Sequence, residues 1–153
     1  DLLITDREEA LRLSGEHDIK SAASFFIDRK VSSLIITNGS KNITVYSDGR
    51  LFGSEELTEM PVSERVIREI KEYQGGDTTG CGDNFAGGVT ASVVEQLQKG
   101  LINPDLKEAC CWGIASGGFT CFYMGGTWFE EKPGEKLARI KPYYESYREQ
   151  IAY

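Results

Sequence analysis

The sequence predicts an α/β fold built around a largely parallel sheet, and three observations carry this prediction. A short apolar run, Leu2 to Ile4, precedes helical patterns and then a continuous apolar run, Val31 to Thr37, which is the order of a βαβ unit. A glycine-rich turn within Gly75 to Gly88 leads into an amphipathic run. The 153-residue chain is 40% hydrophobic and 27% charged, which is the balance of one globular domain.

The N-terminal elements are predicted from helix-end signals and apolar spacing. Asp6 is a candidate N-cap with Glu9 three residues later, which is the arrangement of a capping box. The helix that follows has apolar residues at helical spacing and ends near Gly15. A second helix is expected over Ser21 to Lys30. One strand, Leu2 to Ile4, precedes these helices and another, Val31 to Thr37, follows them. We therefore expect a βαβ unit.

A polar turn follows the second strand. The turn from Thr37 to Ser40 comes at the carboxyl end of a strand, where ligands bind in open α/β sheets. The alternative to a ligand-binding loop is a simple hairpin turn, and the segment can be both. Two short strands, Asn42 to Tyr46 and Arg50 to Phe52, flank Ser47-Asp48-Gly49, which favours a hairpin between them.

Three further helices are expected. The polar stretch from Gly53 to Gln74 has no clear place in the fold but contains a helical pattern from about Ser63 to Tyr73. A long helix from about Asp105 to Tyr123 has small residues in its middle, which indicates tight packing against the helix after the glycine turn. The tail from Ala138 has tyrosines at helical spacing, a pattern typical of packing.

The glycine turn has the groups that an anion-binding site requires. Gly80, Cys81 and Gly82 precede the helix expected over Asn84 to Gln98, so their amides should point out of its N-terminus toward an anion such as phosphate. Asp83 lies in the first turn, where its carboxylate can accept a proton from a hydroxyl. Oxyanion donors beside a base are a large part of the equipment for phosphoryl transfer.

A simpler explanation exists for Asp83, which can be an ordinary N-cap after a glycine turn rather than a base. The pair Gly87 and Gly88 also needs an explanation, because a glycine inside a helix costs roughly 1 kcal/mol of stability relative to alanine. We expect close packing or the approach of a ligand to offset this cost.

Composition excludes several classes of protein. The net charge is −7 and no basic stripe is present, which argues against nucleic-acid binding. No run approaches the length of a membrane span, and no basic-then-apolar leader is present, so we expect a cytoplasmic protein with no membrane partner. The four cysteines show neither zinc spacing nor the density of a disulfide scaffold, and reduced, mostly buried thiols are expected.

The string DTTGCGDNFAGG resembles the C-terminal signature of the ribokinase, or phosphofructokinase B, family of carbohydrate kinases. The resemblance implies a ribokinase-like three-layer α/β/α sandwich and transfer of the γ-phosphoryl group of ATP to a sugar hydroxyl. It also implies that Asp83 is the base and that the amides of Gly80, Cys81 and Gly82 form the anion hole. Cys81 stands where the family usually has alanine, a small-for-small change.

The resemblance implies further binding residues. The segment with Asp6 and Glu9 resembles an Asn-x-x-Glu element in which Asp6 replaces the Asn. The resemblance implies that Asp6 lies near the nucleotide phosphates and that Glu9 organises Mg²⁺ through water. The TNGSKN segment matches a family loop that lies against the nucleotide, and the helix after the signature forms a wall of the adenine pocket. A monovalent cation such as K⁺ lies beside the turn in several members. The residues assigned in this way are Thr37, Asn38, Gly39, Ser40 and Asn42 for the loop, Gly82 for the phosphates, Ile114 and Gly118 for the adenine wall, and Asp77, Thr79 and Gly125 for the cation.

The resemblance covers most of this chain but only the C-terminal half of the family pattern. We therefore expect residues 1–153 to be a single nucleotide-binding and catalytic portion of a ribokinase-like domain whose N-terminal portion is missing. A truncated parallel sheet exposes an edge and apolar faces, which predicts either a homo-oligomer or marginal stability. The sugar is not specified by these residues. A nucleoside kinase of the same family and a non-catalytic nucleotide-binding or assembly domain are the alternatives, and little activity is expected of the isolated chain.

Overall fold

The computed structural model describes residues 1–73 and 75–152, which divide into two compact units. The first unit contains Asp1–Val62 and Gln96–Leu106, and the second contains Ser63–Glu95 and Lys107–Tyr153. Gln74 and Tyr153, which end two of the predicted segments, lie outside the described residues.

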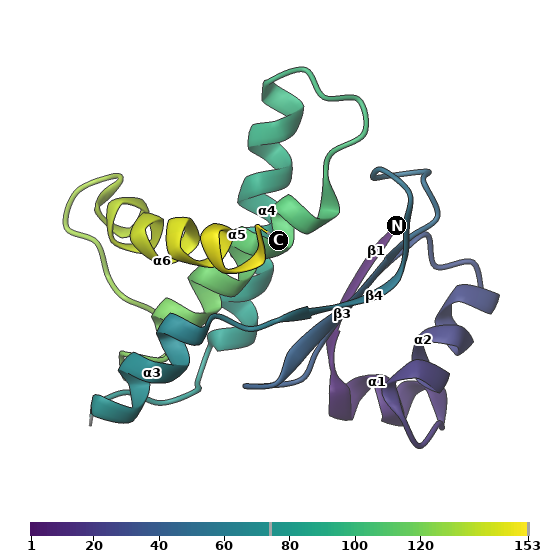
Figure 1. The fold of residues 1–153 in the computed structure, drawn as a ribbon, viewed down its shortest axis with the longest axis horizontal. Helices are drawn as coiled ribbons and strands as arrows, with labels where there is room; N and C mark the ends of the chain where they lie inside the picture. Colours follow the sequence, from purple (N-terminus) through teal and green to yellow (C-terminus); the bar gives the residue numbers. More distant parts are fainter. Residues whose placement is uncertain (74, 153) are drawn as a thin grey trace. The chain divides into compact units, whose positions relative to one another are not determined.

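The first unit is built on a four-stranded sheet in the order β1-β2-β3-β4 (Figure 1). β1 (Leu2–Asp6) and β2 (Ser33–Thr37) are parallel. β3 (Asn42–Ser47) runs antiparallel to β2, and β4 (Glu55–Pro61) runs antiparallel to β3. The predicted βαβ unit is confirmed, whereas the prediction of a largely parallel sheet is wrong, since two of the three strand pairs are antiparallel.

Two helices, α1 (Arg7–Ser14) and α2 (Ile19–Asp28), connect β1 to β2 and pack on one face of the sheet. Gly15 ends α1 in the left-handed conformation, with a φ of 75°, as expected for a glycine C-cap. The apolar side chains between helices and sheet exclude water and form the core of this unit. Its buried members are Ala10, Ala22, Ala23, Phe26, Leu34 and Ile36.

The partner of β3 differs from the prediction. Arg50–Phe52 form no strand, and β3 pairs with β4 instead. β4 lies at the edge of the sheet, and Met60 is its one buried residue. A strand that buries so little of itself has no apolar alternation, and this is why the polar stretch from Gly53 to Gln74 gave no strand signal.

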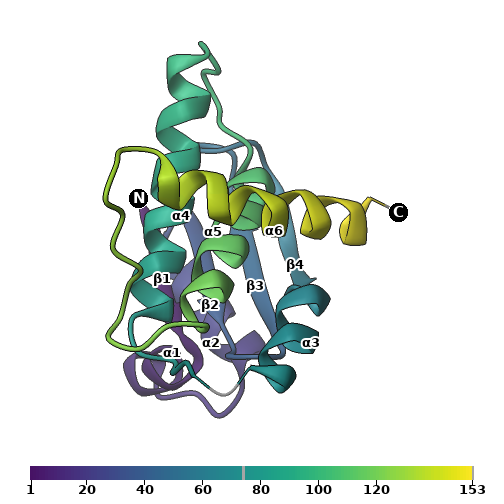
Figure 2. The ribbon, with the colours of Figure 1, turned by 90° about the vertical axis from the view of Figure 1, so that its left-hand side faces the viewer.

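The second unit is helical in its described residues. It holds α3 (Glu64–Glu72), most of α4 (Cys81–Gln98) and α5 (Leu106–Thr120), and α6 (Glu135–Ile151) (Figure 2). The aromatic spacing of the tail is confirmed as packing, because Trp112 of α5 stacks on Tyr144 of α6 with ring centroids 4.0 Å apart. The core cluster here comprises the buried Ala115, Phe119 and Ile140 with a rim of aromatic side chains.

Glycines allow α4 and α5 to pack closely. A Cβ built on Gly88 would lie 2.6 Å from the carbonyl oxygen of Trp112, and one on Gly113 would lie 2.8 Å from Cγ2 of Val89. Neither position has room for a side chain, so the packing explanation holds for both. Gly87 differs, since a Cβ there would meet nothing within 4 Å.

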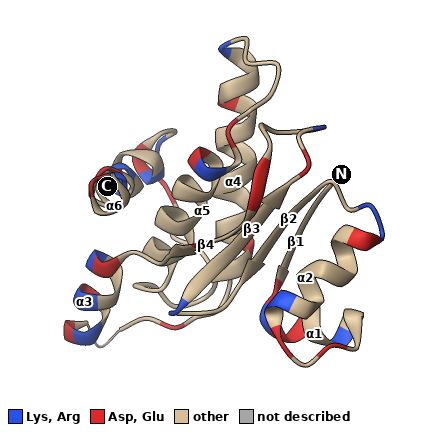
Figure 3. Cartoon of the chain, turned by 45° about the vertical axis from the view of Figure 1, so that its right-hand side comes forward, with Lys and Arg blue, Asp and Glu red and all other residues tan. Residues whose placement is uncertain are grey.

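Charged residues of both signs are interspersed along α3 and α6 (Figure 3). Within residues 1–73 and 75–152, no helix combines the length and the apolar character that crossing a bilayer requires.

Candidate active site

The N-terminus of α4 presents free backbone donors. Gly80 has a φ of 73° and directs the chain into the helix, which begins at Cys81. The amide of Cys81 donates to the carbonyl of Thr78 at 3.3 Å. Among the described residues, the amides of Gly82 and Asp83 donate to no other group. The free donors are therefore the amides of Gly80, Gly82 and Asp83, whereas the sequence predicted those of Gly80, Cys81 and Gly82.

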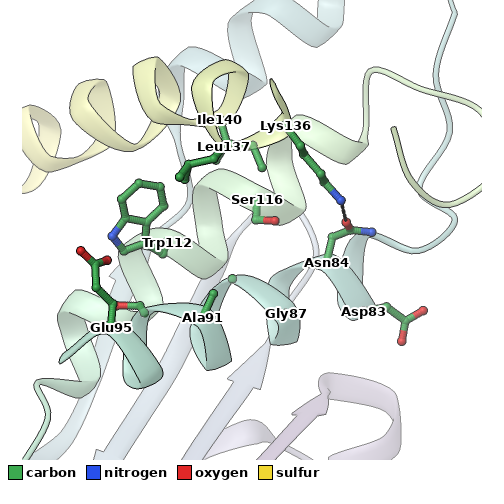
Figure 4. A pocket seen from close by; sticks show the side chains of 12 residues that line it. Asp83, Asn84, Gly87, Ala91, Glu95, Trp112, Ser116, Lys136, Leu137 and Ile140 are labelled. Atoms are coloured by element: carbon green, nitrogen blue, oxygen red, sulfur yellow. Dashed lines mark hydrogen bonds between the residues drawn. The ribbon is translucent and has the colours of Figure 1, made fainter. Parts of the chain in front are cut away.

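Asp83 is an exposed residue in the first turn of α4. Its carboxylate points away from the neighbouring Asn84 and Lys136 (Figure 4). The helix starts two residues before Asp83, so the alternative in which Asp83 is merely the N-cap is wrong. The carboxylate is accessible to a bound hydroxyl and lies on the same turn as the free amides.

Asn84 joins the glycine turn to a second one at Gly125 and Gly126. Its Nδ2 donates to the carbonyls of Gly80 at 2.8 Å and Gly126 at 2.7 Å. Its Oδ1 accepts a hydrogen bond from Nζ of Lys136 at 2.7 Å. The two turns also touch, because a Cβ on Gly80 would lie 2.2 Å from the carbonyl oxygen of Gly126. Asn84 therefore holds the backbone of the candidate anion hole in place.

The residues assigned to a monovalent cation lie in these two turns. The amide of Thr79 donates to Oδ1 of Asp77 at 2.9 Å, and the amide of Asp77 donates to the carbonyl of Tyr123 at 3.3 Å. Gly125 has a φ of 88°. The structure brings these segments together, and their role as cation ligands stays a prediction.

Two cysteines meet beside the turn. Sγ of Cys81 lies 2.9 Å from Sγ of Cys121, which follows the last residue of α5. Donation from the Cys81 thiol lowers the pKa of Cys121, although burial opposes this, and the same bond together with burial raises the pKa of Cys81. Cys110 and Cys111 are fully buried, so the prediction of buried thiols holds for them, whereas Cys81 and Cys121 are partly exposed.

A hollow of about 580 Å³ lies between α4, α5 and α6 (Figure 4). Its floor on α4 has small residues, among them Gly87 and Ala91, which is why space remains beside the helix. Trp112, Lys136 and Ile140 line the other sides. The open space at Gly87 therefore belongs to this hollow.

In the first unit, Asp6 and Glu9 form the predicted capping box. Oδ1 of Asp6 accepts from the amide of Glu9 at 2.8 Å, and Oε2 of Glu9 accepts from the amide of Asp6 at 3.3 Å. Both residues are exposed. Asp6 is also the register partner of Thr37, so the capping box and the loop after β2 lie at the carboxyl ends of neighbouring strands.

The loop from Thr37 to Asn42 is a hairpin turn between β2 and β3. The amide of Asn38 donates to the carbonyl of Asn42 at 3.0 Å, and Gly39 takes the left-handed conformation with a φ of 58°. Ser40 is exposed. The hairpin alternative is confirmed, and nucleotide contact stays a prediction.

The two residues assigned to the adenine wall lie on α5. Ile114 is 5% exposed. A Cβ on Gly118 would lie 2.9 Å from Cγ2 of Val66, so Gly118 packs against α3. Packing accounts for the glycine, and the adenine role stays a prediction for both residues.

Sequence reasoning missed Asn84, Lys136 and Cys121 as parts of this region. Asn84 is adjacent to Asp83 within the motif, so its position was a usable signal. Lys136 and Cys121 reach the turn from 52 and 40 residues away in the chain, and no local pattern marks such contacts.

The chain is similar in sequence to known proteins. Residues 1–132 match the model of the pfkB family of carbohydrate kinases. The chain is similar to a cytidine kinase of Thermococcus kodakarensis, with 32% identity over 91 residues, which are 60% of this chain and 28% of that protein.

Solved structures show the same ribokinase-like α/β fold. An Escherichia coli protein provisionally named Ribokinase II, in complex with ATP and Mg²⁺, matches with a TM-score of 0.67 and 21% identity over 95% of this chain and 39% of its own. Phosphofructokinase-2 from Escherichia coli in complex with potassium matches with a TM-score of 0.66 and 16% identity, over 95% of this chain and 41% of its own. The chain thus spans about two fifths of the length of these structures, and the predicted fold class is confirmed.

Proposed function

We propose that this chain, which belongs to the pfkB family of carbohydrate kinases, carries the base and anion hole of a kinase that transfers the γ-phosphoryl group of ATP to a sugar hydroxyl. The observation that carries the proposal is the turn at the N-terminus of α4. There, the free amides of Gly82 and Asp83 lie beside an exposed carboxylate. A donor pair and a base on one turn match what phosphoryl transfer needs.

Asp83 is the proposed base. It accepts the proton of the acceptor hydroxyl, so that the oxygen becomes a stronger nucleophile as it attacks phosphorus. The free amides of Gly80, Gly82 and Asp83 stabilise the negative charge of the transferring group, and the amide of Cys81, which donates to the carbonyl of Thr78, supports the turn. The helix dipole of α4 adds to this stabilisation because charge develops at its N-terminus.

We propose that the turn binds a phosphate and that other residues of the chain hold the cations that accompany it. A Cβ on Gly82 would meet nothing within 4 Å, so a phosphate can approach the backbone there. The exposed Glu9 carboxylate is proposed to hold Mg²⁺ through water, and Asp77, Thr79 and Gly125 to hold a monovalent cation such as K⁺. Mg²⁺ supplies charge neutralisation on the phosphates when it is bound.

The remaining nucleotide contacts are proposed for other parts of the chain. Asp6 and the loop from Thr37 to Asn42 lie at the carboxyl ends of β1 and β2, the strand ends at which ligands bind in open α/β sheets. Ile114 and Gly118 are proposed for the adenine wall. We also propose that the protein is cytoplasmic and forms a homo-oligomer.

A nucleoside kinase is the second candidate. The observation that favours it is the 32% identity to a cytidine kinase, which is an enzyme named for a nucleoside. Both candidates use the same base and anion hole, because only the group that bears the accepting hydroxyl differs.

Titration of ATP and Mg²⁺ into the chain by calorimetry tests the proposal. Wild type and Asp83→Asn should bind, whereas Gly82→Val should bind at least about tenfold more weakly because its side chain fills the phosphate position. Gly87→Val is the matched control, since that glycine also lies in α4 with open space beside it and is not part of the turn. Equal affinity for Gly82→Val and Gly87→Val would contradict the proposal.

Phosphoryl transfer separates the candidates. Because little activity is expected of residues 1–153 alone, the full-length protein is assayed with a panel of sugars and a panel of nucleosides, and Asp83→Asn should abolish transfer to whichever panel reacts. Saturable ATP binding without transfer to either panel would instead support a non-catalytic nucleotide-binding domain.

A further inference from the structure

Cys81 and Cys121 are placed as a pair at the candidate anion hole. Their Sγ atoms are 2.9 Å apart, and the two residues are 40 positions apart in the chain. Cys81 is the first residue of α4, between the two glycines of the turn, and Cys121 follows α5. Both side chains are partly exposed, in contrast to the fully buried Cys110 and Cys111. Small oxidants in solvent can therefore reach this pair and not the other.

The backbone on both sides of the pair is fixed by close packing. A Cβ on Gly117 would lie 2.9 Å from the carbonyl oxygen of Cys81, and a Cβ on Gly76 would overlap the carbonyl oxygen of Cys121. These two glycines leave room for the cysteine backbones and hold the sulfurs near each other. Because the pair already touches, the thiols need little rearrangement to react.

We propose that Cys81 and Cys121 are a redox modification site, at which a hydroperoxide converts the two thiols into an intramolecular disulfide. One thiol, as thiolate, attacks an oxygen of hydrogen peroxide; the O–O bond breaks, and sulfenic acid and water result. The other sulfur then attacks the sulfenic sulfur, forming the S–S bond and releasing a second water. In total the two thiols lose two electrons and two protons, and one peroxide becomes two waters.

The disulfide weakens anion binding at the turn. This part of the inference rests on the proposed function. A disulfide requires the sulfurs to lie at about 2.05 Å, closer than their contact in the reduced chain. Closure pulls Cys81 toward the end of α5 and moves the amides on either side of it, which are the proposed phosphate donors. Reduction of the bond restores them.

Peptide mapping tests the modification itself. The reduced chain is treated with hydrogen peroxide, alkylated, and digested with trypsin and chymotrypsin, because cleavage after Trp112 separates Cys121 from Cys110 and Cys111. A peptide linked through Cys81 and Cys121 is expected in a monomeric product. Cys110→Ala should give the same link, and Cys121→Ala should give none. Sulfinic acid at either cysteine without a link, or a link between two chains only, would overturn the proposal.

Nucleotide titration tests the consequence. Peroxide should weaken ATP binding by about tenfold or more in wild type, dithiothreitol should restore it, and Cys121→Ala should bind equally well with and without peroxide. A linked chain with unchanged ATP affinity would refute the regulatory effect. If the reduced chain binds no ATP but the link still forms, the proposed function fails and the modification site stands. If the chain binds ATP but no link forms, the modification site fails and the proposed function stands.

Discussion

Asn84→Asp tests whether one side-chain amide holds the two glycine turns together. Nδ2 of Asn84 donates to the carbonyls of Gly80 and Gly126, at 2.8 and 2.7 Å. Aspartate places an oxygen where this nitrogen stood. Both hydrogen bonds are lost, and like partial charges then face each other across the same short distances.

The expected cost follows from these contacts. Each lost hydrogen bond is worth about 1 kcal/mol, and the partly buried carbonyl of Gly126, which has no other donor among the described residues, adds about 1 kcal/mol when it is left without one. The carbonyl of Gly80 still accepts from the backbone amide of Asn84 at 2.9 Å, which the substitution keeps. The new carboxylate attracts Lys136, whose Nζ already lies 2.7 Å from Oδ1 of Asn84. This ion pair is partly exposed and offsets at most about 1 kcal/mol. The free energy of unfolding should therefore fall by about 2 kcal/mol.

Urea unfolding followed by tryptophan fluorescence measures this loss. The chain has two tryptophans, Trp112 and Trp128, and both lie in the second unit with the turn, so the signal reports on that unit. Asp83→Asn is the control. It makes the opposite change at the neighbouring position, whose side chain has no hydrogen-bond partner among the described residues, and should stay within about 0.5 kcal/mol of wild type. Equal stabilities of the two variants would refute the role of Asn84.

Two further predictions concern stability. Gly88→Ala should destabilise the second unit by about 1–3 kcal/mol in the same urea assay, because its Cβ would meet the Trp112 carbonyl. Gly87→Ala should stabilise the unit by up to about 1 kcal/mol, because alanine favours the helix and its Cβ would meet nothing. The reverse order of stabilities would contradict the packing of α4 on α5. Hydrogen bonds from the Ser21 hydroxyl and amide lower the pKa of the Asp18 carboxyl below its usual 3.8. The ionised carboxylate therefore stabilises α2 fully above pH 3.8, and this stabilisation is lost as the pH falls through the lowered pKa. Asp18→Asn keeps the cap and should flatten this acid dependence, measured by circular dichroism; an unchanged acid profile would exclude Asp18 as its source.

Much of the fold could be predicted because its signals are local. The capping box at Asp6 and Glu9, the glycine stop at Gly15 and the apolar run of β2 are patterns of a few residues, and each was found in place. The glycine turn was equally readable, because Gly80 and Asp83 stand in one short string.

The rest depended on contacts that the sequence does not mark. β4 is polar because it lies at a sheet edge, so burial gave it no alternation. The anchoring of Asn84 by Lys136 and the meeting of Cys81 with Cys121 join residues that are far apart in the chain. Such pairs exist only once the helices have packed.

The fit of Gly80 against Gly126 limits how this region can be recombined. The two positions are in van der Waals contact through backbone alone, so each turn is shaped by the other. A chimaera that joins two related kinases at a crossover between these positions would combine turns that were not shaped together. Crossovers placed before Gly76 or after Gly126 keep these close contacts within one parent and are the ones that should yield folded hybrids.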